Sequence, residues 1–95
     1  MQTRSTEPAS LAALRRTFAS IAPHAATLSR DERARLRDQV CTVVGDLKAA
    51  GELPERVVVI IRSVAREEGI GPSGDGLVSE AVAWCIADYF EDTAE

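Results

Sequence analysis

Apolar residues recur at intervals of three and four along most of this chain, which is the spacing that places them on one face of an α-helix. The pattern predicts four helices, over residues 8–22, 30–50, 54–68 and 77–91. The first three helices each carry one apolar stripe; in chain order these are Leu11, Leu14, Phe18, Ile21 and Ala22, then Leu36, Val40, Val43, Val44 and Leu47, then Val57, Ile60, Ile61 and Val64. Amphipathic helices joined by short connections predict an all-α fold, a small four-helix bundle.

Residues that start and stop helices support these boundaries. Ser29 and Glu32 have the spacing of a capping box, in which each side chain pairs with the other residue's backbone N–H. Gly51 and Gly69 follow the second and third helices, where a glycine commonly ends a helix. The run Val57 to Ile61 is β-branched and could form a buried strand. Pro54 suits a first helical turn, and with Gly69 it favours a helix.

The fourth helix has a less regular apolar pattern. At 100° per residue, the stripe expected to face the core is Val78, Val82, Cys85, Ile86 and Tyr89. Trp84 points more than about 90° away from this stripe, on the side of Leu77, and Phe90 leaves it on the other side. Glu80 and Asp88 lie beside Trp84. Two interpretations stay open: neighbouring helices bury Trp84, or Leu77, Trp84 and Phe90 form an exposed interface ringed by Glu80 and Asp88.

Length and composition indicate one soluble domain. The chain has 95 residues, of which 45% are hydrophobic and 27% charged, values typical of a globular protein. We expect residues 1–95 to form a single helical domain whose ends, 1–7 and 92–95, fray. The longest apolar run, residues 81–87, is too short to cross a membrane, and the polar start lacks the apolar core of a signal peptide. We therefore expect no membrane association and a cytoplasmic location.

Charge divides the chain unevenly. Residues 1–50 hold eight basic and five acidic residues, a net charge of +3, whereas residues 51–95 hold three basic and ten acidic residues, a net charge of −7. Such a division suits packing of one half on the other, self-association, or binding of a charged partner.

Enzyme chemistry finds little support in this sequence. Residues 69–74 match G-x-G-x-x-G, but that motif binds pyrophosphate inside a βαβ unit, and the chain has no room for one after it. His24, Cys41 and Cys85 are too scattered to predict a nucleophile pair or a metal site. We expect no catalytic, cofactor-binding or metal-binding residues, and no enzymatic activity.

Two binding functions remain. Arg30, Arg33, Arg37 and Lys48 lie along one side of the second helix and could track phosphates, so a small DNA-binding regulator using the second and third helices is the alternative. Acidic residues beside this strip, and a net charge of −4, count against it. We favour a non-enzymatic protein-interaction or regulatory module. It would self-associate, most simply as a homodimer, or join a complex, through the helix that bears Trp84.

Overall fold

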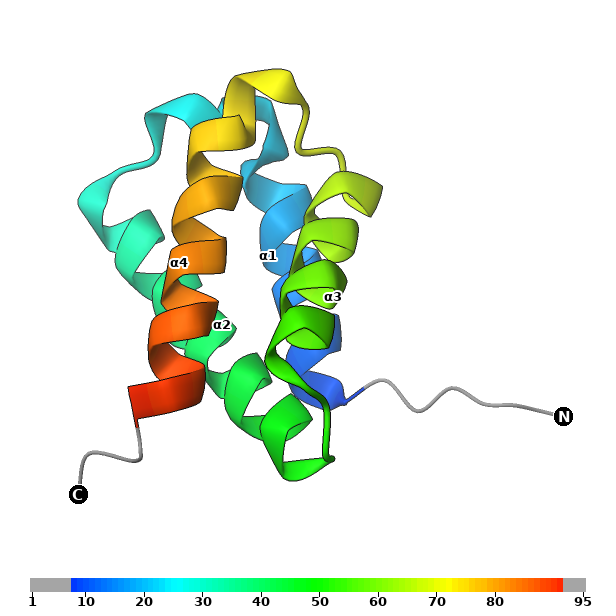
Figure 1. The fold of residues 1–95 in the computed structure, drawn as a ribbon. Helices are drawn as coiled ribbons and strands as arrows, with labels where there is room; N and C mark the ends of the chain where they lie inside the picture. Colours follow the sequence, from blue (N-terminus) through cyan, green and yellow to red (C-terminus); the bar gives the residue numbers. More distant parts are fainter. Residues whose placement is uncertain (1–7, 92–95) are drawn as a thin grey trace, which may run out of the picture.

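The computed structural model describes residues 8–91, and these residues form the predicted all-α bundle (Figure 1). Its helices are α1 (Ala9–Ile21), α2 (Arg30–Ala49), α3 (Pro54–Glu67) and α4 (Asp75–Glu91). Two short 3₁₀ turns, η1 (Ala22–Thr27) and η2 (Pro72–Gly74), complete the described chain. The β-branched run in 57–61 is helical, and residues 8–91 contain no strand. The chain ends that we expected to fray, 1–7 and 92–95, lie outside the described residues.

The helices do not follow chain order around the bundle. α1 packs on α2, α2 on α4, α4 on α3, and α3 on α1. Successive helices alternate in direction, as Figure 1 shows, so α2 and α4 run the same way and lie side by side. Contacts at both ends support this: Arg33 pairs with Glu80 near the start of both helices, and Lys48 bonds to Tyr89 near their ends. This parallel pair forms the groove described below.

Hydrogen bonds confirm the predicted start of α2 and the predicted glycine ends of α2 and α3, whereas α4 begins at Asp75, two residues before the predicted start. Glu32 N–H donates to the Ser29 hydroxyl oxygen at 3.1 Å, while Ser29 N–H donates to a Glu32 carboxylate oxygen at 2.9 Å. α2 and α3 end alike, with Gly51 at φ 91° and Gly69 at φ 101°. In each case the residue after the glycine donates back to the carbonyl five residues earlier, the Schellman arrangement. Glycine takes these positive φ angles without the strain a side chain would add.

The apolar stripes predicted for the first three helices form most of the core. Phe18, Leu14 and Leu36 are among the largest fully buried side chains. Within these three stripes, Ala22 and Ile60 are only partly buried, whereas Ala65, which the pattern did not assign to the core, is buried. Because these helices have clear polar faces, their periodicity was enough to orient them.

The face predicted for α4 is wrong in part. Val78 and Cys85 are buried as expected, but Ile86 is 47% exposed, and Val82 and Tyr89 are only half-buried. Leu77 and Ala81 are buried in their place. The helix is therefore rotated toward its Trp84 side, which faces α2. A helix that is apolar nearly all round gives the periodicity no single face to identify, so the packing of α2 and α3 against it decides.

The glycine-rich segment 69–74 connects α3 to α4, and two of its glycines have structural roles. Gly69 ends α3, and Gly74 is buried where η1 and η2 meet. A Cβ atom at Gly74 would lie 2.7 Å from the Ile70 side chain and 3.0 Å from Ala25. The loop connects two helices rather than a strand and a helix, so the geometry of a dinucleotide-binding turn is absent from the described chain.

Candidate interaction groove between α2 and α4

Trp84 contacts the core and the surface at once. It is partly buried and packs against the hydrophobic cluster, and it also lines an open groove of about 560 Å³ between α2 and α4. The residues that line this groove are Arg30, Arg33, Ala34, Arg37, Asp38, Cys41, Glu80 and Trp84. We call it the α2/α4 groove. Residues from the two predicted surfaces, the arginine strip and the Trp84 side of α4, thus share one site.

Two of the four predicted basic residues are engaged inside the molecule. Arg33 forms an ion pair with Glu80 across the groove. Lys48 donates to the backbone carbonyl of Tyr89 at 2.6 Å and lies 5.0 Å from the centre of its ring, well away from the groove lining. The predicted strip is therefore interrupted, because Arg33 and Lys48 bind to α4.

Arg30 and Arg37, unlike Arg33 and Lys48, make no polar contact with α4. Both are exposed, and neither has a hydrogen bond or an ion pair with any residue in 8–91. They are two helical turns apart, about 10 Å along the α2 axis. Their guanidinium groups are available to an outside ligand.

The acidic residues predicted beside Trp84 occupy the same region. Glu80 neutralises Arg33, and Asp88 lies close enough to Cys41 to affect its ionisation. Asp38 also lines the groove. The carboxylates are thus interspersed with arginines, whereas the sequence predicted a ring of acidic residues around Trp84.

The predicted anchors do not form one surface. Leu77 is 5% exposed and belongs to the core, so its prediction as an exposed anchor is wrong. Phe90 is 53% exposed and makes an edge contact with Tyr89, but it lies about 120° around α4 from Trp84. Leu77 is on nearly the same side of α4 as Trp84 but is covered by the core, and Phe90 is on another side, so only Trp84 remains with Glu80 in the groove.

Burial and charge keep the two thiols protonated. Burial, and then the charge of Asp88, raise the pKa of Cys41. Burial, with Cys41 and Asp88 nearby, raises the pKa of Cys85 to about 12. A raised pKa lowers the fraction of each thiol that is present as the thiolate, the nucleophilic form.

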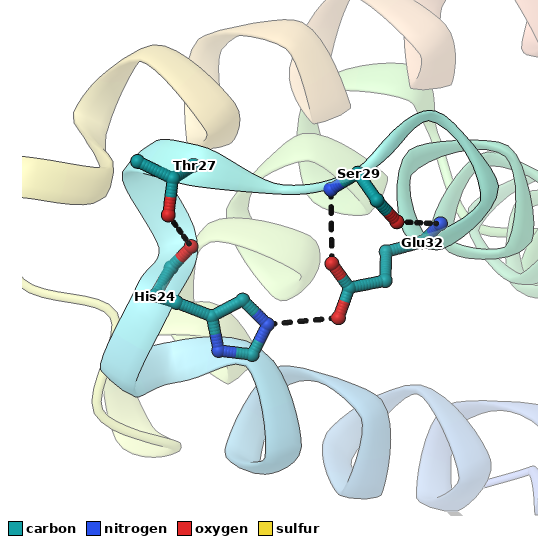
Figure 2. Close-up of polar contacts among 4 residues, drawn as sticks. All are labelled: His24, Thr27, Ser29 and Glu32. Atoms are coloured by element: carbon teal, nitrogen blue, oxygen red, sulfur yellow. Dashed lines mark hydrogen bonds and ion pairs between the residues drawn. The ribbon is translucent and has the colours of Figure 1, made fainter.

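His24 supports the fold through the capping box (Figure 2). Its Nε2 atom lies 2.8 Å from one carboxylate oxygen of Glu32, whose other oxygen accepts from Ser29 N–H. The Thr27 hydroxyl donates to the His24 carbonyl at 3.3 Å. His24 therefore pairs with a capping carboxylate, which ties η1 to the start of α2.

Residues 8–91 contain no group of three or more His, Cys, Asp or Glu side chains arranged to hold a metal ion. Within the same range, no helix combines the length and apolarity needed to span a membrane.

In comparisons with known proteins, no family model matches the chain, and neither a curated protein nor a solved structure matches it.

Proposed function

We propose that this protein is a non-enzymatic interaction module that binds another protein through the α2/α4 groove. One observation carries the proposal. Trp84 packs against the core and lines the same open groove as Arg30 and Arg37. Neither arginine has a hydrogen bond or an ion pair with another residue in 8–91. Tryptophan and arginine are the residue types that most often dominate binding energy at protein interfaces. A partly buried indole in the same groove as two available guanidinium groups supplies an apolar contact, and the guanidinium groups supply charge-assisted hydrogen bonds.

A different protein fits this groove better than a second copy does. In a two-fold dimer both copies use the same surface, so two arginine strips would enter one interface. Like charges brought together in this way oppose association. Homodimerisation is therefore our second choice. A cytoplasmic location is part of the proposal and fits the two free cysteines.

DNA binding receives less support. Arg33 and Lys48 are engaged with α4, and Arg66 of the would-be recognition helix lies 3.6 Å from Asp75. These interactions would have to break before the basic residues could bind DNA phosphates. Passage through heparin at low salt would agree with our preference, whereas salt-sensitive retention lost on substituting Arg30, Arg33 and Arg37 by alanine would favour DNA.

The proposal is tested by photo-crosslinking from defined positions in cells. A photoreactive residue replaces Ala34, which lines the groove, and in a control it replaces Ser63, which is exposed on α3. We expect specific adducts only from position 34, and expect Trp84→Ala to remove them while circular dichroism stays helical. Equal adducts from both positions, or adducts from position 34 that survive Trp84→Ala, would contradict the proposal.

A further inference from the structure

The two available arginines have a spacing that repeats with the α-helix. Arg30 and Arg37 are seven residues apart, with the small side chain of Ala34 between them on the same side of α2. A second helix laid along the groove presents residues seven apart at the same interval, about 10 Å. Two carboxylates at that spacing can each meet one guanidinium group.

The groove also has an apolar part of its lining. Trp84, Ala34 and Cys41 provide its apolar contacts, and the thiol is neutral because burial and Asp88 raise its pKa. The small Ala34 side chain lets a partner backbone come close. An apolar side chain on the same face of a partner helix as its carboxylates would therefore meet Trp84, in the manner of helices that bind hydrophobic grooves.

Electrostatics at one end of the groove also favours negative charge. Because α2 and α4 are parallel, both helices begin at the Arg30 end, and helix N-termini carry partial positive charge. Glu80, the lining carboxylate nearest that end, is neutralised by Arg33. Asp38 is the remaining lining carboxylate without an ion pair in the described chain. Arginine therefore outweighs carboxylate among the groove charges.

The groove continues beyond the Arg33–Glu80 pair. These two residues also line a second hollow of about 340 Å³, which reaches Ala25, Ser73 and Gly76 at the η1 and η2 end. This adjoining hollow gives a bound helix further space at the η1 and η2 end.

We infer that the partner is an acidic α-helical segment with two carboxylates two turns apart and an apolar residue on the same face. This inference rests on the proposed function and adds the chemistry of the partner. Arg30 and Arg37 bind the carboxylates, Trp84 contacts the apolar residue, and the Arg33–Glu80 pair stays formed.

The experiment selects peptides from a displayed library of helix-forming sequences whose exposed positions are randomised. Selection uses the wild-type protein, Arg30→Glu with Arg37→Glu, and Trp84→Ala. A control, Arg56→Glu with Arg62→Glu, changes the net charge equally on exposed positions of α3. Emission of Trp84, the single tryptophan, then measures affinity of the selected peptides.

We expect wild type to select Asp or Glu pairs seven residues apart with an apolar residue on the same face. Arg30→Glu with Arg37→Glu should weaken the binding of these peptides by about tenfold or more, because two charge-assisted contacts are lost. The control, with both substitutions on α3, should leave their binding unchanged. Selection of neutral or basic helices that still require Trp84 would overturn the acidic assignment and leave the groove as an interaction site. Enrichment no greater than that on Trp84→Ala would overturn both proposals.

Discussion

Lys48 holds the end of α4 by two contacts with a single residue, Tyr89. Its ammonium group donates to the Tyr89 carbonyl at 2.6 Å and lies 5.0 Å from the centre of the ring. The Tyr89 hydroxyl in turn donates to the Glu52 carbonyl, just after α2, at 2.8 Å. Because α2 and α4 are parallel, their C-terminal carbonyls gather at one end, where a cation is favourable. These contacts fix α4 beside α2 and so maintain the groove.

Removal of the Tyr89 hydroxyl should weaken this attachment. We expect Tyr89→Phe to lower the free energy of unfolding by about 1 kcal/mol, because it removes one half-buried hydrogen bond and keeps the ring. Urea denaturation followed by circular dichroism measures the change. Ser63→Ala, at an exposed position of α3, serves as the control and should change stability by less than about 0.5 kcal/mol. A Tyr89→Phe variant as stable as wild type would show that the bond to Glu52 adds nothing.

Gly74 should tolerate no side chain. Gly74→Ala places a methyl group 2.7 Å from Ile70 and 3.0 Å from Ala25, so we expect it to cost about 1–3 kcal/mol of stability through overpacking. Gly76→Ala is a matched control, since a Cβ atom there meets nothing within 4 Å and the residue lies in α4. Alanine at that helical position should be neutral or stabilising by up to about 1 kcal/mol. Equal effects of the two substitutions in thermal denaturation would contradict the close packing of η1 and η2.

The capping box should make stability depend on pH in the acid range. The Ser29 N–H, and then His24, hold the pKa of Glu32 below its usual 4.5. A carboxyl group whose pKa is lower in the folded state stabilises the fold above its unfolded pKa, and that stabilisation is lost as pH falls through the folded value. We expect wild type to lose more stability than Glu32→Gln on acidification from neutral pH to below 4.5.

The control for this titration is Asp31→Asn. It removes a carboxylate from the same helical turn but no capping contact, so its stability should follow the wild-type pH dependence. Parallel curves for wild type and Glu32→Gln would mean that the capping carboxylate is not coupled to folding.

Trp84 should report the positive charge of its surroundings. Because Arg30 and Arg37 line the same groove, we expect iodide to quench its emission more effectively than caesium ion at equal ionic strength. The iodide preference should be lost in Arg30→Glu with Arg37→Glu and retained in Arg56→Glu with Arg62→Glu. Stern–Volmer slopes measure both quenchers. Loss of the preference in the α3 control as well would mean that quenching follows net charge rather than the groove.

The two thiols should react at different rates in the native protein. Cys41 is partly exposed in the groove, whereas Cys85 is buried with its pKa raised to about 12. A colorimetric disulfide reagent at neutral pH should titrate one thiol slowly in native buffer and both in denaturant. The native reaction should disappear in Cys41→Ser. Fast labelling of Cys85 in the folded protein would contradict its burial.

The sequence by itself determined the helices and most of the core. Glycines and a capping box marked where α2 and α3 begin or end, and these signals act through local backbone hydrogen bonds that depend little on the rest of the chain. Stripes such as that of Leu36, Val40 and Leu47 oriented three helices, because each has one apolar and one polar face.

Only the tertiary structure decided which side of α4 is buried and which helices are neighbours. α4 is apolar nearly all round, so burial of Leu77 and exposure of Ile86 follow from contacts with α2 and α3 that no local pattern encodes. The groove has the same origin: Arg30 and Arg37 lie on α2 and Trp84 on α4. Local spacing identified each group of residues, but it contains no information on the parallel packing of α2 and α4 that unites them.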